Sequence, residues 1–362
     1  NRTNTIMQSA FFYLSEVIPH EEAKEYMKEY AEKSYGRKGK DVVQKNWNAI
    51  DRGIDGLEQV EVLPEWADLE VNEQIIEAAK PEFIKKIADP INLMKGNELP
   101  VSSIIENGMV DGSFQHGTAH YEKRGIADEV PEWQPDMCIQ CNQCAYVCPH
   151  AVIRPFLIDE KEMAASPEGM PTIKALGRGM DGLEYKIQVS PLDCTGCSAC
   201  VDVCPAPRGK AIVMKSTQSQ IERNEIEYTD YLFNNVSYKD KILGKNTVKG
   251  SQFAKPLFEF SGACAGCGET PYIKLVTQLF GERMIVANAT GCSSIYGASA
   301  PSSPYTTAES GCGPAWASSL FEDNAEYGYG MFQAVNTIRH RILKRMNEIK
   351  ADVSMELSDL FT

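Results

Sequence analysis

The sequence predicts a multidomain protein of mixed α+β and α/β class, in which a small cysteine-rich module is flanked by α/β segments. Three observations lead to this prediction. One cysteine pattern occurs twice within residues 138–204. Apolar residues recur with helical spacing in residues 5–17. A helix, an apolar strand and a loop of small residues follow one another in residues 271–313, which is the order of an α/β sheet with a site at the strand's carboxyl end.

The first part of the chain is predicted to be helical, with helices at residues 5–17, from about residue 20 to Tyr35, and at residues 41–57. Pro19 ends the first helix because proline cannot continue it. Further elements follow from apolar patterning and turn residues. They are a helix over 72–89, an extended connecting segment over 95–137, a surface loop or hairpin over 164–182, a strand at 185–189, a polar connector over 205–255, a helix at 271–280, a strand at 283–288, a loop over 289–313 and an amphipathic run over 331–350.

Two cysteine runs of identical spacing dominate the middle of the chain. Each reads C-x2-C-x2-C-x3-C followed by proline; the cysteines are Cys138, Cys141, Cys144 and Cys148, then Cys194, Cys197, Cys200 and Cys204. This spacing is the ligand signature of a bacterial ferredoxin with two [4Fe–4S] clusters. Such a loop wraps a cluster and turns backbone N–H groups towards its sulfur atoms, and we expect the fourth cysteine to begin a helix. The runs therefore predict a two-cluster ferredoxin module that carries low-potential electrons.

The ligands of the two clusters are predicted to cross between the runs. In two-cluster ferredoxins the fourth cysteine of each run binds the other cluster. The first predicted set is Cys138, Cys141, Cys144 and Cys204. The second predicted set is Cys148, Cys194, Cys197 and Cys200. This crossing holds the clusters close together, which favours electron transfer between them.

Zinc and disulfide bonds are alternative uses for these cysteines. Zinc sites usually contain paired C-x2-C units rather than a triplet with a fourth cysteine. Twelve cysteines in 362 residues are far fewer than the roughly 8–10% of a disulfide scaffold. The spacing favours iron–sulfur clusters over both alternatives.

Four more cysteines lie nearer the end of the chain. Cys264 and Cys267 form a C-x2-C pair in a glycine-rich loop before a predicted helix, an arrangement more typical of a ligand pair than of core residues. Cys292 follows a predicted strand and is by position either a third ligand or an ordinary loop residue. Cys312 is expected to be a small buried residue. Glu269 begins the predicted helix, where the helix macrodipole favours a carboxylate.

Composition and charge narrow the classes of partner. The formal net charge is −14, which makes nucleic acid and anionic membranes unfavourable partners. No apolar run approaches the roughly 18–20 residues of a membrane span. Thiolate ligands need a reducing compartment, so we expect a cytoplasmic protein. The chain is long enough for two or three domains at about 100–200 residues each, so most of it serves a purpose beyond the ferredoxin module.

Several long strings carry a family resemblance: H-Y-E-K-R-G-I-A at 120–127, C-I-Q-C-N-Q-C-A-Y-V-C-P-H at 138–150, C-T-G-C-S-A-C-V-D-V-C-P at 194–205, C-A-G-C-G-E-T-P-Y at 264–272, T-G-C-S-S-I-Y-G at 290–297 and G-P-A-W-A-S-S-L-F-E-D-N-A-E-Y-G at 313–328. Through them the chain closely resembles pyruvate:ferredoxin (flavodoxin) oxidoreductase along essentially its whole length. The resemblance implies oxidative decarboxylation of pyruvate with coenzyme A to acetyl-CoA and carbon dioxide. It also implies a homodimeric parent enzyme that passes electrons to ferredoxin or flavodoxin.

The same resemblance implies further cofactors and ligands. Thiamine diphosphate and Mg²⁺ are expected in the parent enzyme. A third, proximal [4Fe–4S] cluster is expected on Cys264, Cys267 and Cys292, with a fourth ligand outside the chain. Glu269 and Cys292 then lie near the thiamine diphosphate, whereas Cys312 matches no ligand.

The resemblance also predicts domains: residues 1–80 as the C-terminal part of an α/β domain, 81–118 as a connector, 119–237 as the ferredoxin-like domain and 238–362 as the N-terminal part of a thiamine diphosphate-binding α/β domain. The chain lacks the G-D-G motif of the Mg²⁺ and pyrophosphate site, and its ends look cut. We therefore expect a fragment that contains no complete catalytic site and is inactive alone.

Two alternatives stay open. The chain could be a stand-alone iron–sulfur electron-transfer protein, or it could come from an oxidoreductase for a different 2-oxoacid. A plain ferredoxin has no use for C-A-G-C-G-E or T-G-C-S-S, which favours the enzyme. The ligands alone identify neither the acceptor nor the reduction potentials, because hydrogen bonds and exposure tune the clusters.

Overall fold

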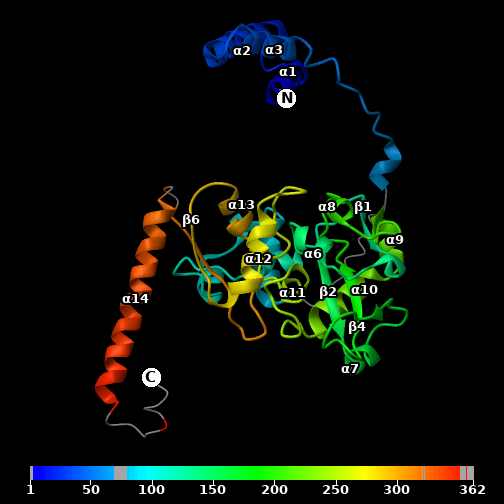
Figure 1. Cartoon of the computed structure of the whole chain (residues 1–362). Helices are drawn as coiled ribbons and strands as arrows, with labels where there is room; N and C mark the ends of the chain where they lie inside the picture. The colour runs from blue at the N-terminus through cyan, green and yellow to red at the C-terminus, as the bar shows by residue number, and fades with distance from the viewer. Residues whose placement is uncertain (1–2, 69–79, 320, 322, 351–355, 357–362) are drawn as a thin grey trace. The chain divides into compact units, whose positions relative to one another are not determined.

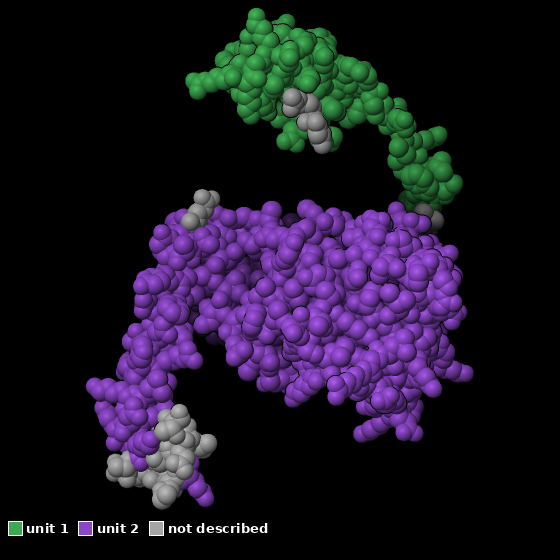
Figure 2. Space-filling model, in the orientation of Figure 1, with its two compact units in different colours: residues 1–76 green, residues 77–362 purple. Residues whose placement is uncertain are grey.

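The computed structural model describes residues 3–68, 80–319, 321, 323–350 and 356. The chain divides into two compact units, residues 1–76 and residues 77–362 (Figure 1; Figure 2). Helices make up the described elements of the first unit, and helices and strands together make up those of the second. The mixed class predicted from the sequence is therefore confirmed.

The α-helices in the described residues of the first unit are α1 (Thr3–Ser15), α2 (His20–Tyr35) and α3 (Lys40–Asp51). Both α1 and α2 contact α3. The Ser9 hydroxyl of α1 donates to the Ile50 carbonyl of α3 at 2.7 Å, and this buried hydrogen bond joins the two helices. The third helix ends at Asp51 rather than at residue 57 as predicted. The turn after it brings Gly53 so close to Ser9 that a Cβ there would lie 2.5 Å from the Ser9 Cβ.

Short helical segments open the second unit: a π-helix at Ile84–Ala88, α4 (Asp89–Asn92), α5 (Val101–Glu106) and a 3-10 turn at Thr118–Tyr121. The helix predicted over 72–89 lies partly in residues 69–79, outside the described residues. The segment predicted to be extended over 95–137 contains α5 and the 3-10 turn, so that prediction is wrong in part. Its turn residues mark the ends of these short helices rather than one continuous loop.

Two small antiparallel sheets frame the cysteine runs. Their strands are β1 (Glu129–Trp133), β2 (Ile153–Ile158), β3 (Ile173–Lys174), β4 (Glu184–Val189) and β5 (Ile212–Ser216). β1 pairs with β5, and the second sheet has the order β2-β4-β3. All six residues of β2 are buried, so this strand lies in the core. The segment predicted as a loop or hairpin over 164–182 supplies β3 and forms a hairpin with β4.

The two cysteine runs adopt matching backbone conformations. Each run contains a short helix, α6 (Gln143–Val147) in the first and α8 (Ala199–Val203) in the second. The two helices contact each other. Cys148 and Cys204 each end their helix, so the prediction that they begin one is wrong. The reason is local: each precedes a proline, which disfavours helical backbone at the residue before it.

Residues 205–255 are folded rather than a polar connector. Besides β5 they contain α9 (Thr217–Glu222), α10 (Glu225–Asn235) and α11 (Val248–Ser251), while α7 (Glu160–Ala164) follows β2. Helix α10 contacts β4, and Gln188 of β4 donates to the Thr229 hydroxyl at 3.0 Å. Tyr228 and Leu232 of α10 pack on Phe156 in a second apolar cluster. The polar residues therefore belong to folded elements, and some of them, such as Thr229, are buried there.

The last part of the described chain contains α12 (Thr270–Phe280), β6 (Ile285–Asn288), α13 (Cys292–Ala298), β7 (Ala315–Ser318) and α14 (Asn324–Ile349). The predicted helix and strand are confirmed within two residues. Strands β6 and β7 pair in parallel, which requires a crossover between them. Helix α13 lies in that crossover, where only a loop was predicted. Helix α12 contacts both α6 and α11 (Figure 1), so this part packs directly on the cysteine module.

Candidate metal centres

A first cavity beside β1 is lined by four cysteines of the two runs, Cys138, Cys141, Cys144 and Cys204. It has about 330 Å³ of empty space, part of it open to solvent. Its other walls are mainly apolar or aromatic, with Trp133 and Tyr185 as the largest side chains. Three thiols thus come from the first run and one from the second, the same grouping that the crossing rule predicts.

A second cavity is lined by Cys148, Cys194, Cys197 and Cys200, again with about 330 Å³ of empty space that is partly open to solvent. Here one thiol comes from the first run and three from the second. The other walls include Pro131, His150 and Met214. The crossing arises because α6 and α8 lie in contact, so that the cysteine at the end of each helix lies beside the other run's loop.

Backbone N–H groups point at the sulfur atoms of these loops. The Gln140 amide lies 3.4 Å from the Cys138 Sγ, and the Gly196 amide lies 3.4 Å from the Cys194 Sγ. Both donors have positive φ, 56° at Gln140 and 67° at Gly196. Position 196 requires glycine, because a Cβ there would lie 3.1 Å from the Glu129 carbonyl. The matched geometry places a dipole at the same position in each loop.

Gln140 tolerates its left-handed backbone because its side chain is fixed at both ends. Its Nε2 donates to the Lys174 carbonyl and its Oε1 accepts from the Leu176 amide, both at 2.7 Å. These bonds attach the first cysteine loop to the β3 hairpin. The segment between the two runs, longer than a minimal ferredoxin needs, therefore supports the first cavity.

The thiols of these cavities are difficult to ionise without metal. Burial raises the pKa of Cys194 to about 12 and also raises that of Cys144. A bound metal reverses this effect, because coordination deprotonates a thiol. All twelve cysteines are free thiols in the structure. Four thiols with amide donors in an apolar cavity fit an iron–sulfur cube, which takes one thiolate on each iron.

The loop that carries Cys264 and Cys267 lies beside the second cavity. A Cβ built at Gly266 would lie 3.6 Å from the Cys197 Cβ. The ring of His150, which lines the second cavity, contacts the Ser261 carbonyl at 3.0 Å and the Cys264 carbonyl at 3.3 Å. The C-x2-C loop therefore adjoins the second cavity.

Burial and hydrogen bonds act in opposite directions on Cys267. Burial raises the pKa of its thiol, but the backbone amides of Glu269 and Thr270 outweigh this and lower it overall. The Glu269 amide lies 3.5 Å from the sulfur. This half-buried thiol is thus prepared for the anionic form that binds metal.

Helix α13 brings Cys292 and Glu269 into one neighbourhood. Tyr296 donates from its hydroxyl to a Glu269 carboxylate oxygen at 2.8 Å. Cys292 lies one turn before Tyr296, on the same side of the helix. Cys264 and Cys292 are both exposed. The described residues contain no group of three or more His, Cys, Asp or Glu side chains placed around a single metal ion.

Sequence reasoning missed a buried lysine beside the cysteines. Lys274 of α12 is 2% exposed. Its ammonium group donates to the carbonyls of Ala145, Tyr146 and Cys148, the last two at 3.0 and 3.3 Å. It therefore caps the carboxyl end of α6 from another part of the chain. No sequence pattern marks this lysine, since a lysine in an amphipathic helix is ordinarily at the surface.

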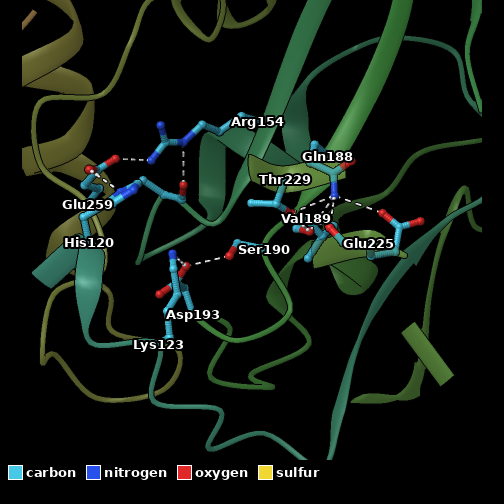
Figure 3. A network of polar contacts seen from close by, with 11 residues as sticks. His120, Lys123, Arg154, Gln188, Val189, Ser190, Asp193, Glu225, Thr229 and Glu259 are labelled. Carbon is cyan, nitrogen blue, oxygen red and sulfur yellow. Dashed lines mark hydrogen bonds and ion pairs between the residues drawn. The ribbon is translucent and has the colours of Figure 1, made fainter. Parts of the chain in front are cut away.

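A buried ionic network joins three segments that are distant in sequence (Figure 3). Arg154 of β2 is paired with Glu259, whose other oxygen lies 3.4 Å from the His120 ring. The guanidinium also lies over the Phe233 ring, 4.1 Å from its centroid. Burial alone would raise the pKa of Glu259, but Arg154 and His120 outweigh it and hold that pKa far below its usual range.

A second pair in Figure 3 lies directly before the second run. The Lys123 ammonium is 2.6 Å from Asp193, which also accepts from the Ser190 hydroxyl at 2.5 Å. Asp193 immediately precedes Cys194. The H-Y-E-K-R segment thus contributes two of its side chains, His120 and Lys123, to fixing the cysteine module.

Comparison with known proteins agrees with this geometry. A 4Fe-4S dicluster domain matches residues 137–208, and a domain of unknown function matches residues 70–127. The chain is 52% identical to the pyruvate:ferredoxin oxidoreductase of Moorella thermoacetica over 99% of its own length. It is also 52% identical to the pyruvate-flavodoxin oxidoreductase of Klebsiella pneumoniae, again over 99%, and 42% identical to a probable pyruvate-flavodoxin oxidoreductase of Escherichia coli over 98%.

The chain is homologous to one segment of these pyruvate:ferredoxin and pyruvate-flavodoxin oxidoreductases. It spans only 29% of the Moorella protein and 30% of the Klebsiella protein. The matched 4Fe-4S dicluster domain includes all eight cysteines of the two runs.

Cys312 lies outside the matched dicluster domain. The sequence predicted that it is a small buried residue. That prediction is wrong, because Cys312 is exposed. It lies in a turn in which its carbonyl accepts from the Ala308 amide at 2.8 Å, so the backbone rather than the thiol makes the local contact.

In the described residues, none of the helices is both long and apolar enough to cross a membrane.

Proposed function

We propose that the chain is the electron-transfer segment of a pyruvate:ferredoxin (flavodoxin) oxidoreductase. One observation carries the proposal: each of two cavities is lined by four cysteines, three from one run and one from the other. A two-cluster ferredoxin needs this arrangement, and single zinc ions or disulfides do not. The identities of about 52% to enzymes with these names support the assignment.

The eight cysteines bind two [4Fe–4S] clusters in this proposal. The first cluster takes Cys138, Cys141, Cys144 and Cys204. The second takes Cys148, Cys194, Cys197 and Cys200. Matching amide donors to Cys138 and Cys194 support a common ligand geometry.

The two clusters act in a fixed order. The second cavity adjoins the loop of Cys264 and Cys267 through Gly266 and His150, so the second cluster receives electrons from that side. The first cavity adjoins the exposed side chain of Ile139. The first cluster is therefore the one from which electrons leave for ferredoxin or flavodoxin.

A third cluster is proposed on Cys264, Cys267 and Cys292, with a fourth ligand from outside the chain. The amide donors that lower the pKa of Cys267 and the closeness of α13 to Glu269 support this set. The exposure of Cys264 and Cys292 is consistent with a site that is completed by further residues.

Thiamine diphosphate, with its Mg²⁺, would supply the carbanion chemistry of decarboxylation in the parent enzyme. Only one side of such a site fits the residues present, namely Glu269 and Cys292. The described residues hold no side-chain group for Mg²⁺, and the chain has no G-D-G motif. We therefore derive no catalytic step within this chain. The role of Glu269 is to orient groups at the edge of the site through Tyr296.

The domains follow the same proposal. Residues 1–80 correspond to the C-terminal part of an α/β domain, 81–118 to a connector, 119–237 to the ferredoxin-like domain and 238–362 to the N-terminal part of the thiamine diphosphate domain. The parallel pair of β6 and β7 supports an α/β character for the last of these. Pyruvate, coenzyme A, homodimer formation and a cytoplasmic location belong to the parent enzyme.

Iron analysis tests the central proposal. The purified chain should hold about eight irons after anaerobic reconstitution, with the EPR signal of two interacting reduced [4Fe–4S] clusters. About two irons or fewer would contradict the ferredoxin assignment. Pyruvate- and coenzyme A-dependent reduction of ferredoxin by the full-length gene product then separates the enzyme from a stand-alone electron-transfer protein. Assays with other 2-oxoacids separate pyruvate from a different substrate.

A further inference from the structure

A buried indole N–H at the first cavity has no protein partner. Trp133 of β1 is 7% exposed and lines the first cavity with Cys138, Cys141, Cys144 and Cys204. Its Nε1 is buried and makes no hydrogen bond to any described residue. A buried donor without an acceptor costs free energy, so its persistence in a folded core points to an acceptor that occupies the cavity.

The other polar side chains of the same wall are already engaged. Tyr185 donates from its hydroxyl to the Asn142 Oδ1 at 2.7 Å, and the Asn142 Nδ2 donates to the Lys249 carbonyl at 2.9 Å. Trp133 is thus the side chain of this wall whose N–H has, among the described residues, only a thiol, that of Cys138, within reach. The indole lies near enough to Cys138 to lower the pKa of its thiol, although burial, the larger effect, raises it.

The second cavity has a different group at the corresponding place. Pro131 lies two residues before Trp133 on the same face of β1 and lines the second cavity. Proline has no side-chain donor. His150, also in that wall, directs both ring nitrogens at backbone carbonyls, those of Ser261 and Cys264. One strand therefore presents an indole N–H to one cavity and an apolar ring to the other.

We propose that the Trp133 N–H donates to a sulfur of the first cluster and raises its reduction potential above that of the second. The inference rests on the proposed function, since it requires clusters in both cavities. A hydrogen bond to a cluster sulfur stabilises the reduced cluster, which carries the larger negative charge. The electron then passes from the second cluster to the first in the energetically favourable direction. Trp133 positions no substrate; it sets the direction of transfer.

Redox titration of Trp133→Phe tests this inference. The variant keeps an aromatic ring and removes only the donor. In the reconstituted full chain, the EPR-monitored midpoint of the first cluster should shift to a more negative potential, while the second midpoint stays unchanged. Ligand variants Cys141→Ala and Cys197→Ala assign the two midpoints. Trp47→Phe is the matched control, because it removes an indole hydrogen bond to the Lys28 carbonyl outside the module and should shift neither midpoint.

A second measurement needs no variant that could lose its cluster. In the wild-type chain labelled with ¹⁵N-indole tryptophan, ENDOR of the reduced first cluster should show an exchangeable proton and a nitrogen coupling. Wild-type-like midpoints in a fully loaded Trp133→Phe protein, or a wild-type spectrum without that coupling, would overturn the inference. A wild-type chain that assembles no [4Fe–4S] cluster would instead overturn the proposed function.

Discussion

The cysteine module and the segment of residues 262–298 both present closely spaced cysteines, but they enclose them differently. In the module, two loops distant in sequence meet through α6 and α8, and each cavity receives four thiols. In the later segment, Cys264 and Cys292 are exposed and Cys267 is partly buried. The comparison teaches that a C-x2-C loop is one wall of a cluster site. Tertiary structure supplies the fourth ligand and buries the cysteines from solvent.

The largest expected effect comes from breaking a ligand set in the module. Cys141→Ala should remove one cluster and lower the iron content from about eight to about four, because three thiolates leave one iron without a ligand. Iron analysis and EPR after anaerobic reconstitution measure the loss. Cys312→Ala is the matched control, since this cysteine is exposed and outside both cavities. Equal iron in Cys141→Ala and the wild type would refute the ligand role.

The junction between the two regions should be sensitive to Glu259. Glu259→Gln leaves the Arg154 guanidinium buried without its charged partner, which is expected to lower the free energy of unfolding by about 3–5 kcal/mol. Urea denaturation at pH 7 measures the change, with exposed Glu160→Gln as the control. If Glu259→Gln lowered the free energy of unfolding no more than Glu160→Gln does, the Arg154–Glu259 pair would not stabilise this junction.

The same carboxylate predicts a pH dependence. The pKa of Glu259 is far below its ordinary value of 4.5 in the folded chain. Its contribution to stability is therefore fully present above about pH 5 and is lost progressively as the pH falls from the unfolded pKa of 4.5 towards the much lower folded pKa. Unfolding measured from pH 7 down to about pH 3 should show the first part of this loss in the wild type and a flatter profile in Glu259→Gln. Parallel profiles would exclude Glu259 as the titrating group.

Lys274→Met tests the contact of α12 with α6, and we expect a smaller loss of stability than in Glu259→Gln. The change removes the donor shared by the carbonyls of Ala145, Tyr146 and Cys148. Loss of hydrogen bonds from a charged donor should cost about 1.5–3 kcal/mol. Denaturation of the chain without iron measures this, with exposed Lys161→Met as the control. Stability equal to the control would mean that the carbonyls are satisfied without Lys274.

The smallest effect is expected in the later segment. Tyr296→Phe removes the hydrogen bond to Glu269 and should cost about 0.5–1.5 kcal/mol. Hydrogen exchange of α13 amides should rise, while the iron content of the module stays at the wild-type value. A loss of module iron in this variant would contradict the separation of the two regions.

The sequence was most informative where chemistry requires a fixed spacing. The crossed grouping of the eight cysteines followed from the two runs alone, and the structure brings the same groups together. Elements with strong periodicity, such as the helix at Thr270–Phe280, were also predicted. Glycine- and serine-rich residues obscured α13, because small residues are typical of both loops and close helix packing.

Side chains that act from afar could not be predicted. Lys274 reaches carbonyls more than 120 residues earlier in the chain, and no local pattern marks such a partner. Trp133 looks like an ordinary core residue of a strand until its N–H is found without an acceptor. The conformation shared by Gln140 and Gly196 was equally hidden, because a non-glycine residue at positive φ depends on the bonds that its side chain makes with the β3 hairpin.

The exchange of Cys148 and Cys204 between the runs has a consequence for biogenesis. Each cavity borrows one thiol from the other run, so neither site is complete until both loops have folded. With the proposed ligand sets, binding of iron and sulfide in one cavity would hold α6 against α8 and so bring the ligands of the other cavity together. With those ligand sets, filling one site would favour assembly of the other, and loss of one cluster would weaken its neighbour. The crossing makes assembly and damage events of the pair rather than of a single cofactor.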